Sequence, residues 1–460
     1  MLVQKWKLSR NHIILITCVS VFLFALFPGK GGLEGDQRDI VGMSNRSDNW
    51  GFIVPFLVGN WPNFWGHWRF SLVVLQLILF WVGLWLLLKR SWDKNNRGMK
   101  IVIIGFTFFS SIFVSQLWRD ATLLGLSTFG LGLLSKASSC RSNYKYALIF
   151  SSLLMLHFAA MFKVLYGTIL GFFFLWILIQ DQVKRRFFIF PSLAIAISLA
   201  FTPYLLDKQL TKIAGLQKVF PEQQPMIFDL ASSYCWGPSD QLVADAAKGL
   251  ELVKRPGFPL QSICASLRPT SWDNLHSSPY QWQFNSPIIR ITGDQEDKVT
   301  QLRNKWISMI INNPIDWAQV RLMYLGWTLT LSNSFVPQND SNTWGGLVGE
   351  LNKVVWSGIY NFASAVDKLR LSSILWALLI ILVLILRAAL ISLGNKREFY
   401  FHARDQFVAV GVLLGTTGLT IFGFVASNGR YVLPYVLLTY LMLLKSKGSI
   451  RNKQQDQHQP

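Results

Sequence analysis

The sequence is poor in charged residues, which make up 15% of its 460 positions, whereas soluble domains carry about 25%. Apolar residues make up 51%, and several apolar runs approach the roughly 17–25 residues that cross a bilayer as a helix. This composition excludes a soluble enzyme and a disordered chain. Only four cysteines are present, which is too few for a disulfide scaffold, and no Cys or His spacing resembles a zinc site.

Basic residues outnumber acidic ones by 44 to 24, which gives a net charge of +20. The excess lies in short clusters beside apolar runs, because residues 207–370 alone hold 15 basic and 14 acidic residues. Basic residues resist translocation, so loops that carry them stay cytoplasmic. The charge therefore indicates membrane topology, with a weaker role in contact with anionic lipid, and no nucleic-acid partner is expected.

Ten apolar segments predict an all-α polytopic membrane protein with about ten transmembrane helices. The first, residues 13–27, follows a basic start and lacks a small-residue cleavage pattern, so we expect a retained helix. The others are residues 70–88, 101–117, 122–134, 147–161, 166–179, 187–206, 371–391, 407–426 and 431–444. With both termini cytoplasmic, this order places every basic cluster on the cytoplasmic side of the plasma (inner) membrane.

The expected spans divide the chain into four parts. Residues 1–206 form an N-terminal transmembrane module, 207–370 one large extracytoplasmic segment, 371–444 the C-terminal helices and 445–460 a cytoplasmic tail. Two parts of the extracytoplasmic segment are ambiguous. Residues 317–331 are apolar enough to enter the membrane although they contain Arg321, and residues 347–366 have one apolar stripe, as in a helix lying on the bilayer.

Two of the cysteines, Cys235 and Cys264, fall in the extracytoplasmic segment, where an oxidising compartment allows disulfides. One interpretation is a bridge that closes a loop of about 30 residues, worth about 3–4 kcal/mol in the chain-entropy model. The other is a pair of unrelated buried thiols. The sequence leaves both open.

Acidic residues at the outer ends of the expected helices are the candidates for chemistry. Asp36 and Asp39 lie in the first outer loop, and Asp120 follows Arg119 in the very short second loop. A carboxylate so close to hydrocarbon is expected to be paired, metal-bound or functional, and Arg119 is its simplest partner. If Asp36 and Asp120 converge, they can hold Mg²⁺ or Mn²⁺, or one of them can be a general base toward an acceptor hydroxyl.

In the expected topology, two further basic residues lie at the outer ends of membrane spans. Lys163 is at the outer end of its hairpin, and Arg430 precedes the last span. Both can bind the phosphate of a lipid substrate, but basic residues at span ends also serve as interfacial anchors. The sequence does not decide between these roles.

Several short motifs occur together along the chain. They are the acidic first outer loop, the Trp-Arg-Asp of residues 118–120 and the Gly-Arg-Tyr-Val-Leu-Pro of residues 429–434. The extracytoplasmic segment adds Phe-Asp-Leu-Ala at 228–231, Ser-Trp-Asp at 271–273 and Asn-Pro-Ile-Asp-Trp at 313–317, followed by Arg321. With these motifs the chain resembles the GT-C glycosyltransferases. These polytopic enzymes include the dolichyl-phosphate-mannose protein mannosyltransferases and bacterial lipid-A aminoarabinose transferase.

The resemblance implies a GT-C-like fold and transfer of a sugar from a polyprenyl-phosphate donor to a glycan, lipid or protein acceptor on the extracytoplasmic side. It gives Asp36 the role of catalytic base or metal partner, and Asp120 the assisting role. The first loop reads Asp-Gln-Arg-Asp, whereas adjacent acidic residues are commoner in the family, so Asp39 is the alternative base. Asp229, with Asp273 and His276, can line the acceptor site or serve a structural purpose.

Other functions fit parts of the same pattern. A glycan polymerase or ligase with a lipid diphosphate donor also has many spans and a large outer loop, but relies more on arginines. A transporter or flippase predicts repeats, broken helices and charges near the bilayer midplane. The sequence has no visible repeat and keeps its acidic residues at outer helix ends, which favours the glycosyltransferase. A non-catalytic scaffold would share most of these features.

Overall fold

The computed structural model describes residues 68–94, 119–138, 144–163, 167–180, 189–216, 218–220, 222–267, 275–277 and 286–330, and a few positions elsewhere after residue 102. Helices contain most of these residues, which confirms the all-α prediction. The described residues also include turns and two short strands, β1 (His276–Ser277) and β2 (Ile288–Ile289), which pair in parallel. The expected span at 13–27 lies outside the described residues. Segments 101–117, 347–366, 371–391, 407–426 and 431–444 are helical at the few positions described.

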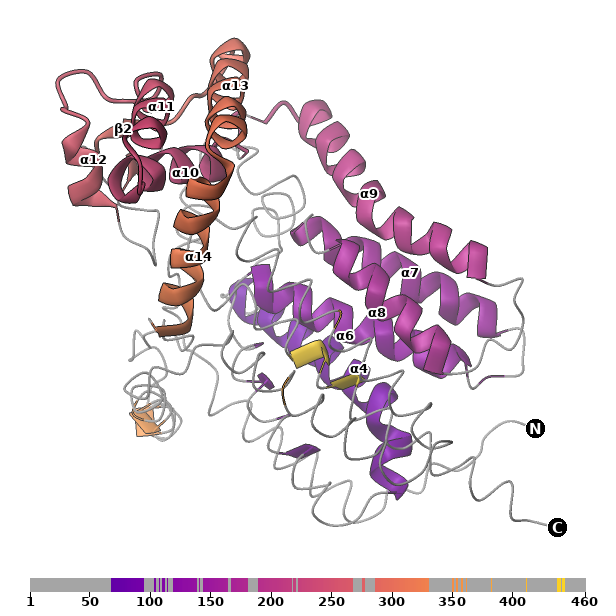
Figure 1. Cartoon of the computed structure of the whole chain (residues 1–460). Coiled ribbons are helices and arrows are strands. Elements are labelled where there is room, and N and C mark those ends of the chain that lie inside the picture. Colours follow the sequence, from indigo (N-terminus) through magenta and orange to yellow (C-terminus); the bar gives the residue numbers. More distant parts are fainter. Residues whose placement is uncertain are drawn as a thin grey trace, which may run out of the picture.

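Five helices pack as a bundle (Figure 1): α4 (Trp68–Lys94), α6 (Arg119–Ser138), α7 (Tyr144–Phe162), α8 (Gly167–Gln180) and α9 (Ile189–Ile213). Each coincides with one predicted span. Among the described residues, α7 is the one helix long and apolar enough to cross a membrane, while the apolar stretches Val74–Lys89 and Gly167–Leu178 are shorter.

Glycines bring α4 and α6 into close contact, as small residues do between membrane helices. A Cβ atom built on Gly132 would lie 2.6 Å from the carbonyl oxygen of Gly83, and one on Gly125 would lie 2.9 Å from that of Gln76. The two contacts follow each other in the same order along both helices, so α4 and α6 are parallel.

The remaining helices of the bundle alternate in direction. Short connections join α6 to α7 and α7 to α8, and Ser152 of α7 donates a hydrogen bond of 2.7 Å to the carbonyl oxygen of Gly130 in α6. Gly167 faces the backbone of Leu199, and a Cβ on Gly171 would lie 2.8 Å from the carbonyl oxygen of Ala196, so α8 and α9 are antiparallel. These directions are those that the predicted order of spans requires.

Polar contacts join the bundle helices inside, and apolar side chains cover parts of the outside. Thr122 donates to Gln76 at 2.7 Å, and His157 and Ser198 join α7 to α9 at 3.1 Å. Exposed large apolar side chains on α4, α7 and α9 include Leu75, Ile78, Val82, Tyr146, Phe150, Leu154, Leu193, Ile197, Phe201 and Leu205. A soluble bundle would place polar residues on such outward faces.

Helix α9 continues to Ile213, beyond the end predicted at residue 206. The apolar run stops before Asp207, but helical hydrogen bonding does not depend on hydropathy and continues until Gly215, whose φ is +61°. The N–H of Gly215 bonds to the carbonyl of Lys212, and that of Leu216 bonds to the carbonyl of Thr211. This is the Schellman arrangement that ends helices at a glycine.

A second unit, which we name the disulfide domain, comprises the described residues between 218 and 330. It contains α10 (Gln223–Trp236), α11 (Asp240–Leu250), α12 (Gln261–Ser266), the strand pair, α13 (Glu296–Asn312) and α14 (Pro314–Thr330) (Figure 1). Its apolar core includes Phe228, Leu230, Leu242, Ile263, Leu302 and Met309. Within this core, the buried amide of Gln223 binds the backbone N–H and carbonyl of Ile291, each at 2.8 Å.

A disulfide joins α10 to α12 in this domain. Cys235 and Cys264 are bonded, with their Cα atoms 5.4 Å apart, inside the range of about 4.4–6.8 Å that a bridge requires. Of the two interpretations that the sequence left open, the bridge is confirmed and the pair of unrelated thiols is wrong.

Candidate functional site

The candidate residues at the outer helix ends are only partly among the described residues. Asp36, Asp39 and Arg430 lie outside them. Arg119 and Asp120 are the first two residues of α6. Backbone N–H groups in the first turn of a helix lack intrahelical partners, and a carboxylate there is favoured by the helix dipole. The Trp-Arg-Asp motif thus coincides with a helix start.

Lys163 lies at the same end of the bundle as Asp120. Because α6 and α7 are antiparallel neighbours, the start of α6 is next to the end of α7. Lys163 directly follows α7, is half-buried, and donates its backbone N–H to the carbonyl of Ala160 at 3.1 Å. The sequence prediction that these two residues share one end of the molecule is consistent with this packing.

The chain leaves this same end toward the disulfide domain. Helix α8 begins at Gly167, which is level with Leu199 in the antiparallel α9. From that level α9 continues to Ile213, and the disulfide domain follows. One end of the bundle therefore holds Arg119, Asp120 and Lys163 and leads into the domain.

Asp229, predicted to bind substrate, occupies a closed position in the disulfide domain. Its side chain is 0% exposed, that of Arg321 is 1% exposed, and Arg321 Nη2 lies 2.6 Å from Asp229 Oδ1. The indole N–H groups of Trp306 and Trp317 donate to Oδ2 at 2.9 and 3.2 Å. Both carboxylate oxygens are engaged, as a buried charge requires. These contacts tie α10 to α13 and α14 and favour the structural alternative for Asp229, and the substrate-binding role stays a prediction.

His276 and Asp273 are the other residues of this segment that were predicted to line an acceptor site. His276 belongs to β1, where its backbone pairs with that of Ile288. Asp273 lies outside the described residues.

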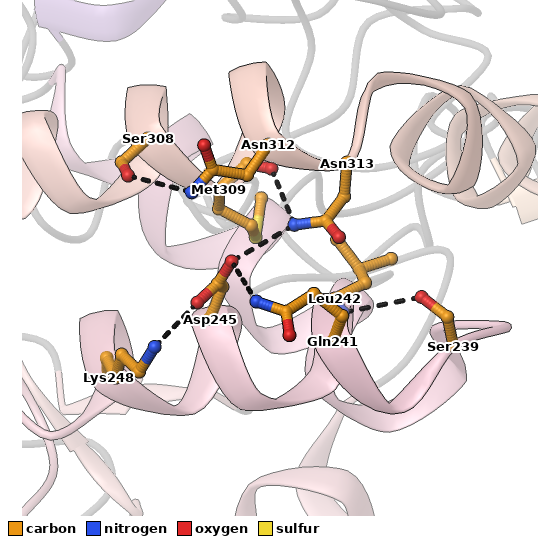
Figure 2. Close-up of polar contacts among 9 residues, drawn as sticks. All are labelled: Ser239, Gln241, Leu242, Asp245, Lys248, Ser308, Met309, Asn312 and Asn313. Carbon is orange, nitrogen blue, oxygen red and sulfur yellow. Dashed lines mark hydrogen bonds and ion pairs between the residues drawn. The ribbon is translucent and has the colours of Figure 1, made fainter.

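A polar cluster around Asp245 was not predicted from the sequence (Figure 2). Asp245 accepts hydrogen bonds from Lys248 at 2.7 Å, Gln241 at 3.2 Å and Asn313 at 3.1 Å. The bond from Lys248 lowers the pKa of the Asp245 carboxyl, with Gln241 and Asn313 acting in the same direction against the effect of burial. Residues 241, 245 and 248 are spaced so that they share one helix face, a signal that was available in the sequence.

The same cluster fixes the junction between α13 and α14. Ser239 caps the N-terminus of α11 by accepting from the N–H of Leu242 at 3.4 Å, and it donates to Asp316 at 2.5 Å. Asp316 lies in the first turn of α14, which Pro314 opens, a position where proline needs no hydrogen-bond partner. The Asn-Pro-Ile-Asp-Trp motif thus binds α11 through Asn313 and Asp316.

The candidate residues that the structure describes at this end of the bundle are Arg119, Asp120 and Lys163, residue types suited to phosphate binding and to proton transfer. No group of three or more His, Cys, Asp or Glu residues that could hold a metal occurs in the part of the chain that the structure describes. The predicted Mg²⁺ or Mn²⁺ pair includes Asp36, so it stays a prediction.

No protein family, curated protein or solved structure matches this chain. The resemblance to GT-C glycosyltransferases therefore stays a prediction from the motifs. For two of these motifs, Phe-Asp-Leu-Ala and Asn-Pro-Ile-Asp-Trp, the structure gives a structural reason, because both supply residues to buried contacts of the disulfide domain.

Proposed function

We propose that this chain is an integral membrane glycosyltransferase. It transfers a sugar from a polyprenyl-phosphate donor to a glycan, lipid or protein acceptor on the extracytoplasmic face. The observation that carries the proposal is the common end of the bundle at which α6 begins with Arg119 and Asp120, Lys163 follows α7, and α9 leads into the disulfide domain.

The proposal includes a GT-C-like arrangement of about ten spans in the plasma membrane, with both termini cytoplasmic. The apolar outward faces and glycine contacts of the bundle support immersion in lipid. The Cys235–Cys264 bridge supports an oxidising compartment for the disulfide domain. The alternating directions of α6 to α9 support the order of the spans.

In the proposed reaction, the bond between the sugar carbon and the donor phosphate breaks and a bond to the acceptor oxygen forms. Asp36 accepts the proton of the acceptor hydroxyl, assisted by Asp120, and positioned acid–base help of this kind contributes about 10²–10⁴-fold. Arg119, Lys163 and Arg430 offset the negative charge that the leaving phosphate gains. Mg²⁺ or Mn²⁺ held by Asp36 and Asp120 would supply positive charge in the same place.

The class of reaction is tested with the purified full chain in proteoliposomes and a panel of polyprenyl-phosphate sugars labelled in the sugar. The proposal expects label to move from lipid to acceptor with release of polyprenyl phosphate, and a chelator decides whether a divalent metal is required. Turnover of a lipid diphosphate donor alone would favour the polymerase or ligase. Movement of intact donor between leaflets without bond cleavage would favour a flippase.

The membrane arrangement has a separate test at Cys140, a free thiol between α6 and α7 at the end of the bundle opposite Lys163. With Cys18 replaced by Ser, an impermeant maleimide should label Cys140 in inverted vesicles but not in intact cells. As a control, Asp297→Cys in the disulfide domain should label in intact cells. Labelling of Cys140 from outside would refute the proposed topology.

A further inference from the structure

An exposed apolar stripe runs along α13 and α14. Ile307 and Ile311 are four residues apart on α13, and Ile315, Ala318 and Leu322 follow at intervals of three and four residues on α14, so each set shares one face of its own helix. The four large side chains are 39% to 72% exposed. The stripe lies opposite the buried face of the same helices, which packs into the core of the disulfide domain.

The stripe continues on both sides of a bend between the two helices. Asn313, with φ −134° and ψ 54°, ends α13: its N–H bonds to the carbonyl of Met309, and its carbonyl accepts from the N–H of Trp317 in the first turn of α14. Figure 1 shows α14 following α13 and leading away from α10, α11 and α12. Helix α14 also covers most of the segment 317–331, whose sequence is apolar enough to enter a membrane.

No exposed, unpaired charge accompanies the stripe in its own part of the chain. Between Trp306 and Met323 the charged residues are Asp316 and Arg321. Arg321 is buried against Asp229, and Asp316 accepts a hydrogen bond from Ser239. Both charges of this stretch are therefore turned toward the disulfide domain, which leaves apolar and uncharged polar side chains outside.

Cations lie immediately before the stripe. Lys305 and Arg303 precede Ile307 by two and four residues, and both are exposed. An apolar face bordered by basic residues at one end matches a bilayer surface, where phosphate groups lie above the acyl chains. A soluble protein partner would not require the inward turn of both charges.

We propose that this stripe is immersed in the outer leaflet of the bilayer and holds the disulfide domain against the membrane. The inference rests on the proposed membrane location of the bundle, and it adds a second contact with lipid that the bundle does not supply. The occupant is the lipid itself, with acyl chains against Ile311 and Ile315 and headgroup phosphates near Lys305.

The test uses the purified full chain in proteoliposomes with Cys18 and Cys140 replaced by Ser and the disulfide left intact. A single thiol is introduced by Ile311→Cys or, as a second variant, Ile315→Cys, and labelled with an environment-sensitive dye. Gln301→Cys, exposed earlier on α13, is the aqueous control, and Phe150→Cys on the outward face of α7 reports on the bundle. We expect lipid brominated in its acyl chains to quench the dye at 311 and 315 at least about twofold more than at 301.

The outcomes separate this inference from the proposal on which it rests. Quenching by lipid at 150, with quenching by aqueous iodide at 311 and 315, would overturn the inference and leave the membrane location standing. Quenching by iodide at all positions would overturn both. Protection of 311 and 315 from both quenchers would mean that protein covers the stripe, which also contradicts the inference.

Discussion

Asp229 is a charge held away from water, and its partners decide whether the disulfide domain is stable. Asp229→Asn leaves the Arg321 guanidinium buried without a counter-charge, and breaking a buried pair in this way costs about 3–5 kcal/mol. We expect a large fall in the unfolding midpoint of the purified full chain, measured by its thermal unfolding, because Trp306 and Trp317 also lose their charged acceptor.

The matched control for this prediction is Arg303→Gln. Arg303 lies 3.8 Å from Glu222, and both side chains are nearly half exposed, so its removal should change stability by less than about 1 kcal/mol. If Asp229→Asn were no more damaging than this control, the buried pair would not have the structural role given to it here.

The Asp245 carboxyl links stability to pH. Its pKa is lowered in the folded chain, first by Lys248, so its contribution is complete above the unfolded value of about 3.9 and is lost as pH falls through the lower folded value. Asp245→Asn should therefore be less stable than the wild type near neutral pH, and the difference should shrink below about pH 4. Thermal unfolding of both chains across a pH series checks this, and a difference that stays constant would contradict it.

The roles of these two aspartates could be predicted only in part. The Gln241, Asp245 and Lys248 spacing is local, so a helical wheel reveals it. The pairing of Asp229 with Arg321 joins residues far apart in the chain, and no spacing rule predicts such a contact. The sequence alone left Asp229 open to both an acceptor role and a structural role.

Helix packing in the bundle depends on glycines that allow backbones to touch. In a Gly132→Ala chain the new Cβ would lie 2.6 Å from the carbonyl oxygen of Gly83. Backbone cannot yield as a flexible side chain can, so α4 and α6 must separate, at a cost of about 1–3 kcal/mol. A lower unfolding midpoint in detergent is the expected result.

Gly358→Ala is the control for the packing prediction, because Gly358 is helical and a Cβ there has nothing within 4 Å. Alanine at such a site should be neutral or stabilising. Equal effects of the two substitutions would show that close packing at Gly132 does not matter.

The presence of the bundle helices could be predicted from the sequence, because a long apolar run indicates both that an element is there and that it is a helix. Their ends could not, as α9 shows, because a Schellman arrangement at Gly215 ends that helix rather than the loss of hydropathy at Asp207. The Cys235–Cys264 bridge was one of two open alternatives, since sequence separation does not fix the distance between two residues.

At the scale of the whole molecule, the described helices divide into a bundle with apolar outward faces and a disulfide domain with an apolar core. Helix α9 runs through the predicted boundary at residue 206 and ends at Ile213, before the disulfide domain begins at residue 218. The site could be predicted only as a set of helix ends, since the contacts that would select a sugar or an acceptor come from residues scattered over several loops. The other residues predicted for this site, Asp36, Asp39 and Arg430, lie outside the described part of the chain.

Sugar transfer by carboxylate variants tests the central claim most directly. With the purified full chain and a labelled polyprenyl-phosphate sugar, Asp36→Asn and Asp120→Asn should each lose about 10²-fold or more of wild-type transfer while donor binding persists. Asp297→Asn, an exposed carboxylate on α13, should transfer at the wild-type rate. Loss in Asp39→Asn with full activity in Asp36→Asn would move the base to Asp39. Full activity in all the variants would contradict the account.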